Sequence, residues 1–152
     1  MEYRDVVRDF AERTKKNLET IDRLRDLGEE VYETTQLINS MLGLLVFPRE
    51  EFVDRIPQIP FADLARAGWP TPNVRNRFPQ ARDLRQLIRY LRNAIAHFNL
   101  EFLSDGEHQI SGLRVWNTRP GSRVTTWDAE LSLDDLRNIA ERFTSLLLAE
   151  AV

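Results

Sequence analysis

The segment Arg92-Asn93-Ala94-Ile95-Ala96-His97 brings an arginine, an amide and a histidine together within six residues. An imidazole with an unperturbed pKa of about 6.5 can take or give a proton near neutrality. A guanidinium can stabilise the negative charge that develops at a reacting phosphate. RNA carries its own nucleophile, the 2′-hydroxyl, so these groups are chemically able to cleave it and to leave a 2′,3′-cyclic phosphate. The sequence has no cysteine and no glycine-rich phosphate loop, and we expect neither a metal nor a cofactor.

A helix over about residues 80–98 has to position these groups. Its buried face is marked by apolar residues at three- and four-residue steps, namely Leu84, Leu87, Ile88, Leu91, Ile95 and Phe98. Another face carries a polar column of Arg85, Arg89, Asn93 and His97, with Arg92 on its flank. We therefore predict that Arg85 and Arg89 contact RNA. The alternative is a solvated arginine face paired with acids of the first helix, such as Glu19 or Asp22.

Arg92 and His97 do not automatically face the same atom, because residues five apart on an ideal helix are about 140° out of phase. Three routes can bring them together: the reach of the arginine, a distorted helix end, or a dimer in which each chain supplies part of the site. Taken by itself, His97 also fits a structural histidine that caps the end of its helix.

Three more helices are predicted from apolar residues at helical spacing, over about 3–27, 29–47 and 132–150. The C-terminal half of the second is apolar nearly all round, which predicts deep burial. Ser132 and Asp135 have a spacing similar to a capping box and mark the start of the last helix. Residues 48–79 hold six of the seven prolines, and we expect a loop with short helical turns near 49–55 and 61–67.

β-Branched and aromatic residues on both sides of a turn at 119–122 predict a β-hairpin over about 108–130, with His108 in a turn or at a strand edge. We expect Trp116 and Trp127 to form a cross-strand pair that packs the hairpin on the helices, with stacking on RNA bases as the alternative. Tyr90 should lie in the core or at an interface. The predicted fold class is mainly α: one domain over 1–152, an up-and-down antiparallel four-helix bundle with a β-hairpin before the last helix.

The overall charge argues against a protein that coats nucleic acid by charge alone, because 21 basic residues face 24 acidic ones and the net charge is −3. Lys15 and Lys16 are the only lysines, so the other 19 basic residues are arginine, which binds phosphate in a bidentate fork. A genome rich in G and C would also enrich arginine. No apolar run approaches the roughly 20 residues that span a bilayer, and the charged N-terminus lacks the apolar stretch that is typical of a signal peptide. We expect a cytoplasmic protein that does not bind membranes.

The motif and its surroundings resemble the HEPN superfamily. Arg92 and His97 match its RxxxxH signature, with Asn93 in the polar position after the arginine. The segments 39–48, 92–105 and 113–117, together with Trp127, are similar to a stand-alone bacterial, often plasmid-borne, HEPN branch, and the resemblance covers most of the chain. It implies an α-helical bundle, a homodimer and often metal-independent RNA cleavage. Arg92 and His97 would then be catalytic and Asn93 would support them.

The first functional hypothesis is therefore a metal-independent endoribonuclease that acts as a homodimer with a composite site. Such a protein could serve as a toxin or a phage-defence effector, with a cognate antitoxin as a further candidate partner. Toxins of the superfamily that are paired with a nucleotidyltransferase antitoxin carry a tyrosine two residues after the histidine, where this chain has Asn99. The alternatives are a non-catalytic HEPN homodimer that binds a nucleotide, RNA or a partner protein, and a purely structural dimerisation module.

Overall fold

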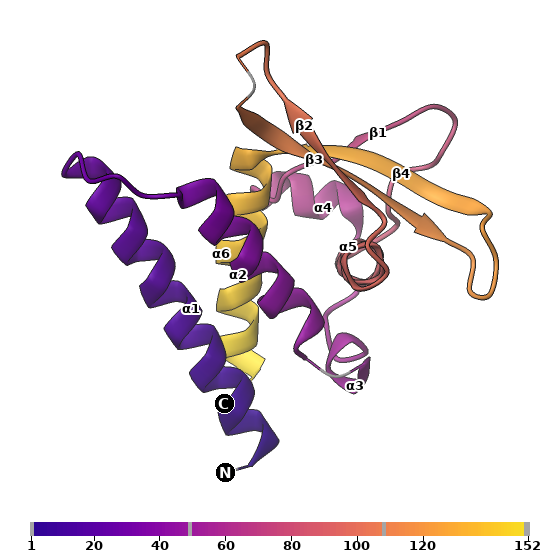
Figure 1. Cartoon of the computed structure of the whole chain (residues 1–152). Coiled ribbons are helices and arrows are strands. Elements are labelled where there is room, and N and C mark those ends of the chain that lie inside the picture. Colours follow the sequence, from indigo (N-terminus) through magenta and orange to yellow (C-terminus); the bar gives the residue numbers. More distant parts are fainter. Residues whose placement is uncertain (1, 49, 108, 151–152) are drawn as a thin grey trace. The chain divides into compact units, whose positions relative to one another are not determined.

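The structure, a computed structural model, describes residues 2–48, 50–107 and 109–150. His108, which the sequence places in a turn or at a strand edge, lies outside these residues. The chain divides into two compact units, Met1–Pro48 with Leu136–Val152, and Arg49–Asp135. The elements of both are labelled in Figure 1.

The first unit contains α1 (Tyr3–Asp26), α2 (Glu33–Val46) and most of α6 (Leu133–Glu150). α1 ends where the sequence predicts, since Gly28 adopts a φ of +81° after its last turn. A Cβ on Gly43 would lie 2.7 Å from Cζ of Phe10, so the glycine lets α1 and α2 approach closely. Arg137 of α6 pairs with Asp22 of α1 at 2.5 Å. No helix in the described part of the chain is long and apolar enough to cross a membrane.

The prediction that the C-terminal half of α2 is buried all round is wrong in part. Met41, Leu44 and Leu45 are buried, whereas three apolar side chains are exposed, namely Leu42, Val46 and Phe47. Helical periodicity explains the split, because a helix that packs on one side leaves the opposite side open whatever residues it carries. The ring of Phe47 still stacks on that of Phe10, at 4.7 Å between centroids.

The second unit combines a sheet with helices. In chain order it contains α3 (Glu50–Val53), α4 (Phe61–Arg66), β1 (Asn73–Val74), α5 (Leu84–Ala96), β2 (Leu100–Ser104), β3 (Ile110–Thr118) and β4 (Thr125–Ser132). The strands form one antiparallel sheet in the order β1-β4-β3-β2. α3 and α4 confirm the two predicted helical turns of the proline-rich segment. The sheet is larger than the predicted hairpin, and the four-helix bundle is not confirmed, since α5 belongs to this unit and α1, α2 and α6 to the other.

α5 packs on the inner face of this sheet. Its predicted stripe is buried from Leu84 to Ile95, and only Phe98, at 76% exposure, departs from the expectation. The side chain of Asp83 caps the helix by accepting a hydrogen bond from the Gln86 amide at 2.8 Å. At the end of the sheet, Ser132 and Asp135 exchange two hydrogen bonds of 2.9 and 3.1 Å, which confirms the predicted capping pair.

The expected cross-strand pair of tryptophans is wrong. The register of β3 and β4 places Trp116 opposite Asp128 and Asn117 opposite Trp127, so the two indoles lie on opposite faces of the sheet. Trp127 is fully buried and stacks on Tyr90 of α5, with ring centroids 4.9 Å apart. A register one residue from the expected one accounts for the difference, because each such step moves a side chain to the other face.

Candidate functional site

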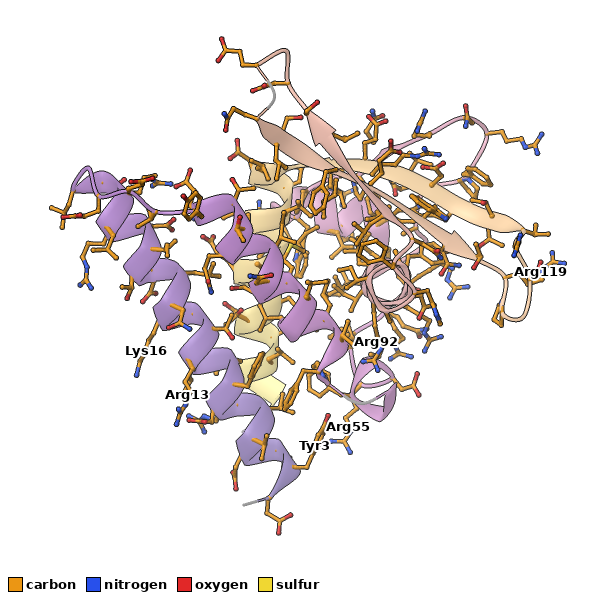
Figure 2. All side chains as sticks on the ribbon, viewed as in Figure 1. Tyr3, Arg13, Lys16, Arg55, Arg92 and Arg119 are labelled. Atoms are coloured by element: carbon orange, nitrogen blue, oxygen red, sulfur yellow. The ribbon has the colours of Figure 1, made fainter. Side chains whose placement is uncertain are left out.

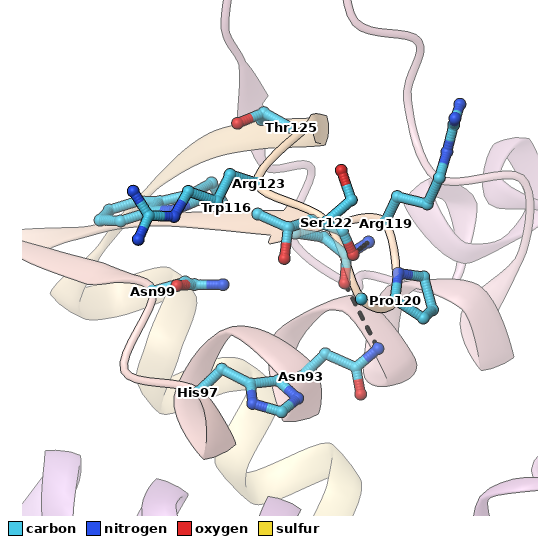
Figure 3. A pocket seen from close by; sticks show the side chains of 12 residues that line it. Asn93, His97, Asn99, Trp116, Arg119, Pro120, Ser122, Arg123 and Thr125 are labelled. Carbon is cyan, nitrogen blue, oxygen red and sulfur yellow. Dashed lines mark hydrogen bonds between the residues drawn. The ribbon is translucent and has the colours of Figure 1, made fainter.

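An open pocket of about 830 Å³ lies in the second unit, between the C-terminal end of α5 and the β3–β4 turn. α5 contributes Asn93 and His97, and Asn99 follows directly after the helix. The hairpin contributes Trp116–Arg123 and Thr125. Figure 3 shows Asn93 and His97 on one side of this pocket, with Ser122 and Arg123 on the other. Two of the three residues of the predicted motif therefore share one pocket.

The end of α5 determines where His97 stands. His97 is the C-cap residue, and Phe98 follows with a φ of +57°. The Asn99 amide donates to the Ala94 carbonyl at 2.7 Å and the Phe98 amide to that of Ile95 at 3.1 Å, which is the Schellman pattern. The imidazole is exposed and makes no hydrogen bond or ion pair with the residues that the structure describes. The backbone of His97 caps the helix, while its side chain is available to a ligand.

Asn93 is held by a relay of amides that runs into the sheet. Its Nδ2 donates to Oδ1 of Asn117 at 3.3 Å, and Nδ2 of Asn117 donates to the Thr126 hydroxyl at 2.8 Å. Thr126 donates in turn to the Asn117 carbonyl at 3.2 Å. The register shifts here, and Thr126 is the extra residue of the bulge that results.

Sequence reasoning missed Asn117, although a signal for it exists. Leu113 and Val115 alternate inward along β3, and both are buried. Asn117 continues that alternation as a polar residue on the buried face, where it is 8% exposed. A buried amide has to be hydrogen-bonded, so this position predicts a polar partner on α5 or β4.

The β3–β4 turn adds two arginines that sequence reasoning did not assign to the site. Arg119 and Arg123 line the pocket, and both are exposed. Neither guanidinium makes a hydrogen bond or ion pair with any residue in the described ranges. Of the residues whose placement the structure describes, no aspartate or glutamate lines the pocket. Although the chain has a net charge of −3, this pocket therefore has a local surplus of positive charge, which favours an anionic ligand.

A family model described as HEPN pEK499 p136 matches residues 1–151. The chain belongs to this HEPN family. No curated protein and no solved structure gave a significant match. HEPN membership suggests a nuclease or nucleotide-binding role in general terms.

The remaining residues predicted for this HEPN site lie outside the pocket. Arg92 is half-buried and does not line it. Figure 2 shows the side chain of Arg92 extending below the α5 helix, away from the hairpin tip that carries Arg119. Arg85 donates to the Ile56 carbonyl at 2.8 Å, and Arg89 pairs with Asp54 at 2.7 Å. The predicted polar column therefore divides, with its last two residues at the pocket and its first two bonded to the chain around α3.

A second polar cluster, formed by Arg114, Asp128 and Glu101, links the strands on the outer face of the sheet. Arg114 of β3 donates two hydrogen bonds to Asp128 of β4, at 3.1 and 2.8 Å, and one to Glu101 of β2 at 3.2 Å. The hydrogen bond to Asp128 is the main reason why the pKa of Arg114 is raised above its ordinary value. The same guanidinium lies 5.4 Å from the ring centroid of Trp116, within cation–π range. Arg114 thereby ties together three strands and one residue that lines the pocket.

Within the described residues, no group of histidines and acids could hold a metal ion.

Proposed function

We propose that this HEPN protein is a metal-independent endoribonuclease whose reacting phosphate binds beside His97. One observation carries the proposal: Asn93 and His97, from the HEPN motif, line a pocket in which no carboxylate of the described residues takes part. An RNA phosphate that enters it meets a titratable imidazole, an amide that is already oriented and a positive environment.

The reaction needs one proton removed and one supplied. The 2′-oxygen attacks the adjacent phosphorus, the bond to the 5′-oxygen breaks, and the products are a 2′,3′-cyclic phosphate and a 5′-hydroxyl. The imidazole of His97 takes the proton of the 2′-hydroxyl or gives one to the leaving 5′-oxygen. The amide of Asn93, held by Asn117, supports the phosphate or the imidazole in a fixed orientation.

Arg92 enters this proposal through a homodimer. On an ideal helix, Arg92 lies about 100° from Asn93 and about 140° from His97, so we propose that the arginine and the histidine that meet at one phosphate come from different chains. A two-fold axis beside α5 would let Arg92 of the partner subunit approach His97 and stabilise the charge of the transition state. In this scheme each dimer has two composite sites.

The biological role that fits such an enzyme is that of a toxin or phage-defence effector in the cytoplasm, with a cognate antitoxin as a further partner. Asn99 lines the pocket at the position where the nucleotidylated toxins carry tyrosine, so control through a tyrosine at that position is not available to this chain. Arg89 remains a candidate RNA contact, because its partner Asp54 is 61% exposed and the pair can open at little cost. Arg85 is a weaker candidate, because its guanidinium donates to a backbone carbonyl.

The second candidate function is a non-catalytic HEPN homodimer that binds a nucleotide, RNA or a partner protein. The positive charge of the pocket favours it, because Arg119 and Arg123 can retain an anion without any chemistry. The two candidates differ in whether RNA is cleaved.

The test is incubation of purified protein with single-stranded and structured RNA in EDTA, beside Arg92→Ala and His97→Ala variants of verified fold. Cleavage by the wild type but by neither of these two variants, with cyclic-phosphate ends, supports the enzyme. Arg66→Ala is the matched control, because Arg66 is an 80% exposed arginine outside the pocket. No cleavage of either RNA by an intact dimer favours the binding protein.

A mixture of the two inactive variants tests the composite site. If Arg92 and His97 act across the dimer, heterodimers contain one intact site, and exchange should restore about a quarter of the wild-type activity. If both residues act within one chain, every site in the mixture is defective and no activity returns.

A further inference from the structure

We infer that the β3–β4 turn is the phosphate-binding arm of this site, in which Arg123 and Arg119 hold successive phosphates of a single RNA strand. The inference rests on the proposed function and extends it, because it assigns the contact with the strand to residues outside the HEPN motif. Arg123 would bind the phosphate nearest His97, and Arg119 the next one along the strand.

The backbone of the β3–β4 turn is fixed by hydrogen bonds within the turn. The Ser122 amide donates to the Arg119 carbonyl at 3.0 Å, and the Arg119 amide donates to the Val124 carbonyl at 2.9 Å. The Ser122 hydroxyl accepts from the Val124 amide at 3.0 Å. Gly121 has a φ of +68°, and with Pro120 before it the turn fits the type II pattern. An anion that binds here therefore meets a backbone that is already ordered, which lowers the entropic cost of binding.

The two arginines stand on either side of this turn and point in different directions. Figure 3 shows Arg123 extending across the pocket above Asn99, and Arg119 pointing away from α5. A single small anion would not need two cations that diverge in this way. A strand with a phosphate at every nucleotide can use both, because one arginine can bind the reacting phosphate and the other a neighbouring phosphate.

The charges around the turn favour phosphate over a neutral or basic ligand. Among the described residues, the guanidiniums of Arg119 and Arg123 have no acidic partner, and no acid lines the pocket. An arginine retained without an intramolecular partner can offer its whole planar fork to a phosphate. Arg114 shows the contrast within the same sheet, since Asp128 and Glu101 engage it on the outer face.

Binding of an RNA that cannot be cleaved tests the arm separately from catalysis. The probe is a fluorescently labelled, fully 2′-O-methylated single strand of about 12 nucleotides, which fits the site sizes of single-strand binders. Fluorescence anisotropy gives Kd at several salt concentrations between about 50 and 200 mM. Each phosphate contact to a single strand contributes about −0.7 to the slope of log K against log salt.

The double variant Arg119→Gln/Arg123→Gln should have a slope shallower by about 1.4, and each single variant one shallower by about 0.7. Arg66→Gln, which removes one exposed charge elsewhere, should bind like the wild type. Arg119→Lys/Arg123→Lys should keep the slope, because both charges remain, but bind more weakly because the bidentate forks are lost.

A double glutamine variant with the slope of the wild type overturns the inference, as does a wild-type protein that does not bind the probe. The cleavage assay separates this result from the proposed function. If the wild type cleaves RNA while the double variant binds like it, only the arm is wrong. If the slope falls as expected while the wild type cleaves nothing, the arm stands and the site belongs to a binding protein.

Discussion

Phe98 offers a prediction whose sign follows from the backbone. Phe98 has a φ of +57° and is 76% exposed, directly after His97. The left-handed region costs a residue with a Cβ about 1–2 kcal/mol, and glycine escapes that cost. At an ordinary helix or strand position, glycine is instead less stable than alanine by about 0.5–1 kcal/mol.

The informative comparison is between Phe98→Gly and Phe98→Ala, because both variants lack the ring and differ only in the Cβ. After subtraction of the entropic cost of glycine, the glycine variant should be more stable by about 0.5–1 kcal/mol. When Phe98→Gly is compared with the wild type, the gain from the relieved backbone nearly cancels the loss of the ring, since a ring about one-quarter buried contributes roughly 0.5 kcal/mol.

Urea denaturation, followed by circular dichroism, measures the difference. With an m-value of about 2 kcal/mol/M, the midpoint of the glycine variant should exceed that of the alanine variant by about 0.25–0.5 M. An alanine variant as stable as the glycine variant, or more so, would refute the reasoning that the cap of α5 is strained at Phe98. A glycine variant that is more stable yet less active would indicate that the exposed ring beside His97 serves the ligand.

Three further predictions concern Tyr90, Arg114 and Gly121. Burial raises the pKa of Tyr90 above its ordinary value of 10.0, against the opposing charge of Arg82. Tyr90 therefore ionises at a lower pH in the unfolded chain than in the folded one, and the free energy of unfolding falls as the pH rises from about 10 through the folded-state pKa. Tyr90→Phe should remove this contribution to the loss of stability. The measurement is the urea midpoint, which should fall less in the variant than in the wild type between about pH 8 and pH 11. Arg114→Ala should destabilise the protein by about 2–3 kcal/mol in thermal or urea denaturation, because Asp128 is 5% exposed and loses its bidentate partner. The stability of Arg114→Lys should lie between those of the wild type and Arg114→Ala. A midpoint that is unchanged in both variants would contradict the stabilising role of the Arg114–Asp128 pair. Gly121→Ala should weaken binding of the 2′-O-methyl probe without any change of charge, because the φ of +68° at this position strains an alanine. The cause would be the backbone and not a clash, since a Cβ at Gly121 would meet nothing within 4 Å. Binding equal to that of the wild type would mean that the probe does not need this turn geometry.

Much of the fold follows from the order of residues along the chain. The stripe from Leu84 to Ile95 predicts α5 and its buried face, and Gly28 predicts the end of α1. The Ser132–Asp135 pair likewise identifies the start of α6. These features are local, because helical periodicity and caps depend on residues within a few positions of one another.

The partners of the site were beyond such reasoning. The sequence pointed to Asn93 and His97, and both line the pocket. It did not indicate Asn117, which lies 24 residues away from Asn93, or that Arg119 and Arg123 line the same pocket. It also grouped Arg89 with the motif, whereas Asp54, 35 residues away, takes its guanidinium.

The sequence by itself determined the main helices, the buried stripe of α5 from Leu84 to Ile95, the HEPN motif and the lack of cysteine. Tertiary structure decided which strands pair, which face each tryptophan occupies and which side chains stand across the pocket from His97. The physical reason is that strand register is a long-range choice. A shift of one residue turns every side chain of a strand to the other face, and the bulge at Thr126 makes such a shift beside the site.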